Sequence, residues 1–149
     1  MDTIVVATDG SAAGTAALAE AIELAKATGD RLLVVTVWRP LQGDFGLPYS
    51  NLSLSTELIA VERERAERTL AEAKAEAERA GLAVETVLRS GDPAGEICAV
   101  AASERARLLV IGSHGHGAVL SALLGSVSSA VLHRASCPVV VVRAPTAPG

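Results

Sequence analysis

The residues best placed for chemistry form a glycine-rich stretch between residues 112 and 126. It contains Gly112, Gly115 and Gly125, with Ser126 directly after the last of them, and it follows an apolar run. Glycine lets the backbone approach a ligand and adopt a positive φ, and successive backbone N–H groups can then form a concave site for an anion. Ser126 begins a predicted helix, whose first N–H groups and dipole favour a phosphate. The stretch therefore predicts a phosphate-binding loop.

Two common phosphate-binding motifs are missing from this stretch. The P-loop pattern requires Gly-Lys-Ser/Thr, and the only lysines of the chain are Lys26 and Lys74. A GxGxxG dinucleotide fingerprint beginning at Gly115 would need a glycine where Leu120 stands. The sequence therefore supports neither a P-loop NTPase nor a standard dinucleotide-dependent dehydrogenase.

The histidines of the loop suggest a phosphate contact rather than a metal site. His114 and His116 flank Gly115, and either imidazole could approach a phosphate. Two ligands are too few for a zinc site, and His133 belongs to a different predicted element. We therefore expect no metal centre, and we expect His133 on a helix surface.

The elements that must position this loop alternate between strand and helix. Apolar, β-branched runs predict strands at residues 3–8, 31–38, 82–88, 107–111 and 138–143. Helical spacing predicts helices after Ser11 up to Gly29, over 55–80, after Asp92-Pro93, and over 126–134.

This alternation predicts an α/β fold with a parallel sheet that helices cover on both faces. Ligands of such sheets bind beyond the carboxyl ends of the strands. Asp9-Gly10 and Gly112 each follow a predicted strand, so they can meet at one site. The residues between 39 and 53 form a long loop of the kind that serves as a lid or binding loop.

Length and composition limit the possible classes of protein. The 149 residues fit one domain, which we place at 1–144 with a flexible, proline-containing tail at 145–149. Half of the residues are apolar and the net charge is −4, which argues against disorder and against a nucleic-acid surface. No basic leader precedes the first strand, and no apolar run approaches the roughly 18 residues of a membrane span. We therefore expect a cytoplasmic protein, with Cys98 and Cys137 reduced.

The glycine spacing belongs to a larger ordered pattern. Gly112, Gly115, Gly125 and Ser126 match Gly-x2-Gly-x9-Gly-Ser; the chain also opens with IVVATDGS, carries Gly-Asp-Pro at 91–93 and closes with PVVVV. In this order, over nearly the whole chain, these features resemble the universal stress protein family, specifically its ATP-binding subgroup. Thr8 is a departure, since an apolar residue is common there.

The resemblance implies a fold and a ligand. The fold is an open five-stranded parallel sheet in the order 3-2-1-4-5, of the adenine nucleotide alpha hydrolase-like type, and the ligand is ATP, with or without magnesium. Asp9 would approach the ribose, Val37 would lie against the adenine, and Ala7 and Thr8 would line the same pocket. The ribose and phosphates would be held by Ile111, Gly112, Gly115, Gly125, Ser126 and Val127, with His116 beside them.

A homodimer is expected as well. The resemblance implies one, and Val139–Val142 would form an apolar edge strand in the 3-2-1-4-5 order. An exposed apolar edge promotes aggregation unless it is covered, and two-fold pairing with a second copy would cover it.

Three functions remain open from the sequence. The leading one is a regulatory ATP-binding protein of the stress response that hydrolyses ATP weakly or not at all. The alternative is a slow ATPase or adenylyl-transfer enzyme on the same fold. The third is an interaction module that binds no nucleotide, in which the glycine loop only packs. Separately, Asp9 could serve only as a turn residue before Gly10 that caps the first helix.

Overall fold

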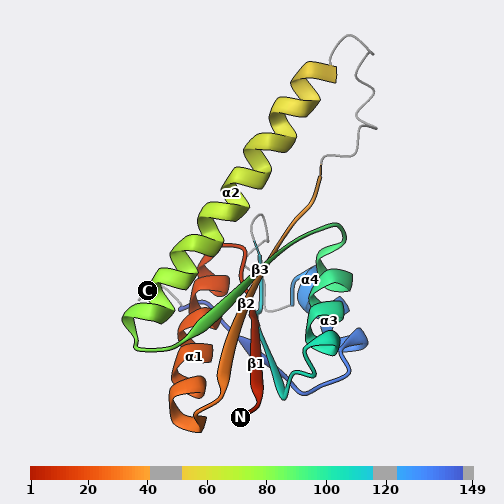
Figure 1. Ribbon diagram of the computed structural model, residues 1–149. Helices are drawn as coiled ribbons and strands as arrows, with labels where there is room; N and C mark the ends of the chain where they lie inside the picture. The colour runs from red at the N-terminus through yellow and green to blue at the C-terminus, as the bar shows by residue number, and fades with distance from the viewer. Residues whose placement is uncertain (41–51, 116–123, 146–149) are drawn as a thin grey trace.

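Strands and helices alternate along the chain, and the strands form one parallel sheet. The computed structural model describes residues 1–40, 52–115 and 124–145 (Figure 1). Its elements in chain order are β1 (Thr3–Ala7), α1 (Ala12–Thr28), β2 (Arg31–Trp38), α2 (Leu52–Arg79), β3 (Val84–Ser90), α3 (Pro93–Ser103), β4 (Leu108–Gly112), α4 (Ser126–Arg134) and β5 (Val139–Val142).

The strands pair in the order β3-β2-β1-β4-β5, and every pairing is parallel. The expected α/β class and strand order are therefore confirmed. The first strand, β1, lies at the centre of the sheet. β2 and β3 follow on one side of it, and β4 and β5 lie on the other side. Because β1 and β4 are neighbours whose connections run in opposite directions, their carboxyl ends form the edge where ligands of open α/β sheets bind.

Helices cover both faces of the sheet (Figure 1). Alternate residues of β1, such as Ile4 and Val5, are buried on opposite faces. Ile4 belongs to the core formed with α1 and α2, whereas Val5 packs with α3 and α4. Burial on both faces explains why β2 is continuously apolar from Leu32 to Val35.

The helix boundaries follow local chemistry. Ser11 caps α1 by accepting from the Gly14 N–H at 3.1 Å, and Asp92 caps α3 by accepting from the Gly95 N–H at 2.9 Å, as expected. The third strand was expected at 82–88 but spans Val84–Ser90. The reason lies at the end of α2, where Gly81 has φ +88° and Leu82 donates to the Ala77 carbonyl at 3.1 Å. Leu82 therefore completes a Schellman cap instead of entering the sheet.

Helix α2 begins at Leu52, earlier than the expected residue 55, and its first turns extend beyond the sheet (Figure 1). Its Ala66, Ala73 and Ala77 are buried, whereas Leu58 and Val61 are exposed. The small alanines let the second half of the helix lie close against β2 and β3.

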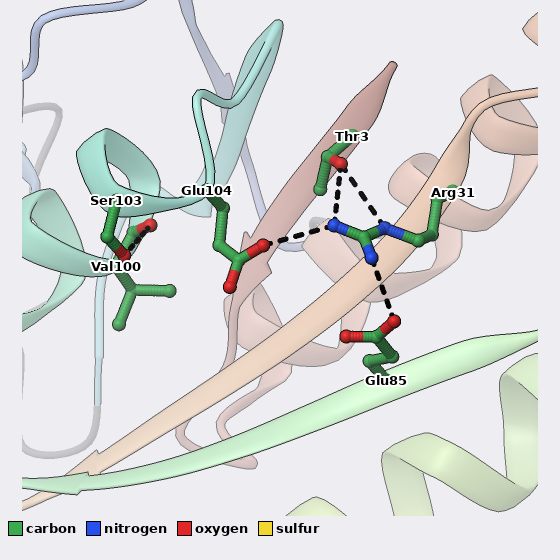
Figure 2. A network of polar contacts seen from close by, with 6 residues as sticks. All are labelled: Thr3, Arg31, Glu85, Val100, Ser103 and Glu104. Carbon is green, nitrogen blue, oxygen red and sulfur yellow. Dashed lines mark hydrogen bonds and ion pairs between the residues drawn. The ribbon is translucent and has the colours of Figure 1, made fainter. Parts of the chain in front are cut away.

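A polar network joins the elements at the amino edge of the sheet, opposite the carboxyl ends (Figure 2). The Arg31 guanidinium donates to Glu85 at 2.8 Å, to Glu104 at 3.0 Å and to the Thr3 hydroxyl at 3.0 and 3.3 Å. It thereby links β1, β2 and β3 to the residue that ends α3.

Asp30 lies beside this network and is almost fully buried. A hydrogen bond with the Thr28 side chain, assisted by the Asp2 N–H and by Arg107 at 2.7 Å, outweighs burial and lowers the pKa of Asp30. The amino edge thus holds charged contacts that depend on pH.

Candidate functional site

A pocket of about 200 Å³ opens at the carboxyl edge of the sheet, between the ends of β1, β2 and β4 and the helices α3 and α4. Its walls combine apolar side chains with glycine backbone. The lining residues are Ala7, Thr8, Asp9, Gly14, Val35, Val37, Arg39, Pro93, Ile97, Ile111, Gly112, His114, Gly115, Val127 and Ser128.

One half of the pocket is an apolar compartment, which we define by Val35, Val37, Pro93, Ile97 and Ile111. The strand residues point to the α3 side because β2 and β4 alternate, and they pack with the core on that face. Pro93 and Ile97 close the compartment from the first turns of α3. This half can bury a flat apolar group such as a nucleobase.

The other half is bounded by glycine backbone. A Cβ at Gly112 would lie 2.7 Å from the Ala13 carbonyl carbon, and a Cβ at Gly115 would lie 2.7 Å from Asp9 Oδ2. The glycines with positive φ in the described residues are Gly10, Gly29, Gly81 and Gly91, and none of them belongs to the stretch between residues 112 and 126. The expectation that these loop glycines serve φ > 0 was therefore wrong for Gly112, Gly115 and Gly125; close approach requires the first two.

The start of the loop is fixed by hydrogen bonds to α4 and β5. The buried Ser128 hydroxyl lies 2.7 Å from the Gly112 carbonyl and 3.0 Å from the Ser113 carbonyl. The Gly125 N–H donates to Ser113 at 2.9 Å, and the Ser113 N–H donates to Val142 at 2.8 Å. These bonds bring the amino end of α4 back to the carboxyl end of β4, where its N–H groups can face an anion.

Asp9 occupies the middle of the site, directly beyond β1. Its Oδ1 accepts from the Ser11 N–H at 3.0 Å, so the residue does stabilise the turn before α1. The cap of α1 is Ser11, however, and not Asp9. The other carboxylate oxygen, Oδ2, faces Gly115, and both residues line the pocket. Gly14 has no Cβ to collide with this carboxylate or with Thr8, which explains a glycine in the first turn of a helix.

Most of the residues expected to bind the ligand lie together. Ala7, Thr8, Asp9, Val37, Ile111, Gly112, Gly115 and Val127 line the pocket. Gly125 and Ser126 lie beside it, as the N-cap and first residue of α4. His116 lies outside the described residues, and His133 is exposed on α4 as expected.

Some lining residues were not identified from the sequence. Pro93 and Ile97 belong to a helix that was read only as core, although it also begins at a carboxyl strand end. Ser128 follows Ser126 by two positions in α4, and the sequence prediction assigned only Ser126 and Val127 of this helix to the site. Arg39 follows the second strand directly and was assigned only to the loop.

Charged side chains form a chain at the rim of the apolar compartment. Arg39 NH2 lies 3.5 Å from Asp92 Oδ1, and Arg134 NH1 lies 3.2 Å from Asp92 Oδ2. The Gly95 N–H, followed by Arg134, lowers the pKa of Asp92, so this carboxylate remains charged at neutral pH. On the opposite wall the Ser113 hydroxyl lies 3.0 Å from His114 Nδ1.

Three further features concern the described part of the chain: metal ligands, membrane-spanning helices and thiols. No group of three or more His, Cys, Asp or Glu side chains there could hold a metal ion. No helix in that part has the length and apolarity to span a membrane. Cys98 and Cys137 are both free and half-buried.

Fold and site together define an open α/β protein with a ligand pocket at the carboxyl edge of its sheet. The profile of the Universal stress protein family matches residues 1–143. A universal stress protein from Thermus aquaticus is 42% identical over 142 residues, covering 95% of this chain and 98% of that protein.

Two solved structures with bound nucleotides are also similar. A universal stress protein in complex with cAMP superposes with a TM-score of 0.71 at 29% identity, covering 97% of this chain and 98% of that one. The universal stress protein from Archaeoglobus fulgidus in complex with dAMP gives a TM-score of 0.68 at 26% identity, covering 95% and 98%. The chain belongs to the universal stress protein family.

Proposed function

We propose that this protein binds ATP in the carboxyl-edge pocket and acts as a regulatory, nucleotide-responsive homodimer in the cytoplasm during stress. One observation carries the proposal: an apolar compartment and a glycine-bounded edge lie in one pocket, with the Asp9 carboxylate between them. Those are the surfaces that a base, a ribose and a chain of phosphates require, with the ribose in the middle. The cAMP and dAMP complexes of two relatives support an adenine nucleotide as the ligand.

In this arrangement the base lies against Val37 and Ile111, and the ribose hydroxyls donate to Asp9. The phosphates lie along Gly112 and Gly115 toward the N-terminus of α4, where Ser126 is exposed. Backbone N–H groups bind phosphate in the ground state, and only contacts that strengthen in the transition state would accelerate hydrolysis. We therefore propose binding with little turnover, and magnesium as the ion that ATP brings with it.

The dimer is proposed to form along β5, which the strand order places at one edge of the sheet. The Pro138 and Val142 carbonyls accept from β4, so by alternation the N–H groups of Val139 and Val141 point away from it. Val131 of α4 packs in one core cluster with Val139 and Val141, and the next residue, Leu132, is apolar and 43% exposed. Antiparallel pairing of two β5 strands would use both features.

Nucleotide and dimer would be coupled through the loop. The Ser113 N–H donates to Val142, the last residue of β5, and Ser128 holds the two carbonyls at the end of β4. A ligand that binds at Gly112 and Ser113 would therefore act on residues that are bonded to the proposed dimer strand. Coupling of this kind is reciprocal, so the dimer should bind ATP more tightly than the monomer.

The first experiment is to denature the purified protein and to identify released nucleotides by mass spectrometry. ATP is the expected result. ADP or AMP would favour slow hydrolysis or adenylyl transfer, and the absence of nucleotide, with no binding by calorimetry, would favour an interaction module instead.

The dimer has its own test, because sedimentation can be measured with and without ATP. Val141→Pro should weaken self-association, since proline removes a donor from the outer side of an edge strand. A wild-type protein that remains monomeric at concentrations of tens of micromolar would contradict the dimer without affecting the nucleotide site.

A further inference from the structure

Arg39 occupies an unusual position at the entrance of the pocket. It follows β2 directly, lines the pocket, and extends NH2 to 3.5 Å from Asp92 Oδ1. Asp92 is fixed in turn, because it caps α3 through the Gly95 N–H and pairs with Arg134. The guanidinium therefore extends from the end of a strand to the first turn of a helix.

The two ends of this connection flank the apolar compartment. Val37 lies two residues before Arg39 on one wall, and Pro93 follows Asp92 on the other. A side chain that joins these walls lies across the rim of the compartment. A base that enters the compartment would have one face toward the apolar side chains and its outer face or edge toward Arg39.

We propose that Arg39 stacks on the nucleobase of the bound nucleotide and that Asp92 positions it for this contact. The inference rests on the proposed function, which places the base in the apolar compartment. A guanidinium can donate in its own plane to a carboxylate while its faces remain open to an aromatic ring. The ion pair with Asp92 therefore orders Arg39 without using the surface that stacks.

A phosphate contact is the main alternative for an arginine at a nucleotide site. The glycine-bounded edge lies at the ends of β1 and β4, formed by Gly112, Gly115 and Asp9. The partner of Arg39 belongs to α3, whose Pro93 and Ile97 wall the apolar compartment. The position of the ion pair thus favours the base over the phosphates.

The test compares two ligands, ATP and adenosine, by calorimetry or by displacement of a fluorescent ATP analogue. Arg39→Gln should weaken both ligands by the same factor, about three- to tenfold, because both carry the base. Arg39→Lys should weaken both similarly, since lysine keeps the charge but lacks the planar group.

Asp92→Asn tests the positioning role, because asparagine caps a helix as well as aspartate does. It should cause a smaller loss for both ligands, and the double variant Arg39→Gln/Asp92→Asn should bind no more weakly than Arg39→Gln alone. Arg63→Gln is the matched control. Arg63 is exposed on α2, pairs with Glu67 at 3.0 Å and does not line the pocket, so its loss should leave both affinities unchanged.

Four results would overturn the inference. A loss confined to ATP and restored by Arg39→Lys would assign Arg39 to the phosphates, and unchanged affinities in Arg39→Gln would make the ion pair a surface contact only. Additive losses in the double variant would show that Asp92 does not act through Arg39. A wild-type protein that binds neither ligand would overturn the proposed nucleotide site itself, and the role of Arg39 with it.

Discussion

Gly115→Ala should separate ligand binding from folding. The added Cβ would lie 2.7 Å from Asp9 Oδ2, whereas a carbon and an oxygen in ordinary contact are about 3.3 Å apart. The carboxylate must therefore move by about 0.6 Å, away from the added Cβ. A shift of this size is enough to break a hydrogen bond between Asp9 and a ribose hydroxyl.

The expected effect on binding is large, whereas the effect on stability is small. Loss of one hydrogen bond to a charged group costs about 1.5–3 kcal/mol, which corresponds to about 10- to 150-fold weaker binding of ATP. Gly115 is exposed and its φ is not positive, so alanine adds no backbone strain. We expect the free energy of unfolding to change by less than about 1 kcal/mol.

Gly112→Ala is the contrasting variant in the same loop. Its Cβ would lie 2.7 Å from the Ala13 carbonyl carbon and 2.8 Å from the Ala13 oxygen, and backbone cannot move aside as a side chain does. We expect a loss of about 1–3 kcal/mol of stability from this overpacking. Urea unfolding and calorimetric titration with ATP would be measured on both variants.

A double-mutant cycle identifies the residue through which Gly115→Ala acts. If the new methyl group displaces Asp9, then Asp9→Asn and Gly115→Ala should not be additive in their effect on ATP affinity. A folded Gly115→Ala protein with wild-type affinity would refute the proposed contact between Asp9 and the ligand. Additive losses would show that Gly115 contacts the ligand independently.

Three further predictions concern the groups that support the site and the fold. Ser128→Ala should lower the free energy of unfolding by about 1–2 kcal/mol, measured by urea titration, because the two carbonyls at the end of β4 lose a buried donor. The lowered pKa of Asp30 stabilises the fold above the unfolded value of about 3.9 and ceases to do so as the pH falls through the folded value. Between pH 6 and pH 3 the wild-type protein should therefore lose more stability than Asp30→Asn, and equal losses would contradict this. Burial raises the pKa values of the Cys98 and Cys137 thiols, so both should react slowly with a thiol reagent at pH 7.5 and rapidly in denaturant.

The fold could be predicted from the sequence because its signals are local and mutually consistent. Strand β2 and helix α4 have the expected bounds, since a continuous apolar run and a helical stripe each indicate one structure. The start of β3 was misplaced because Leu82 is apolar in either role. Only the Schellman cap at Gly81, a feature of backbone geometry, assigns Leu82 to the end of α2.

The candidate site could be predicted only in part. Residues next to strand ends, such as Asp9 and Gly112, were identified because the topology brings carboxyl ends together. Arg39 and Ser128 depend on side-chain direction and on contacts between distant segments, which spacing along the chain does not encode. The reason for the loop glycines also required the structure, because a close approach to Ala13 or to Asp9 depends on how α1 packs against β4.

The amino edge of the sheet holds the Arg31 network, which stabilises the fold, whereas the carboxyl edge holds the pocket proposed to bind the ligand. At the amino edge, Arg31 bonds to Thr3, Glu85 and Glu104, and none of these side chains belongs to the described pocket lining. At the carboxyl edge, Gly112 lies against the Ala13 backbone of α1 and its carbonyl accepts from the Ser128 hydroxyl of α4, while the Ser113 N–H donates to Val142 of β5. We therefore expect a ligand bound at the carboxyl edge to act first on β5 and on its proposed dimer contact, because the Ser113 N–H donates to Val142 at the end of β5. We expect the hydrogen bonds of Arg31 at the amino edge to remain unchanged when a ligand binds at the carboxyl edge, because none of the residues that form them lines the described pocket.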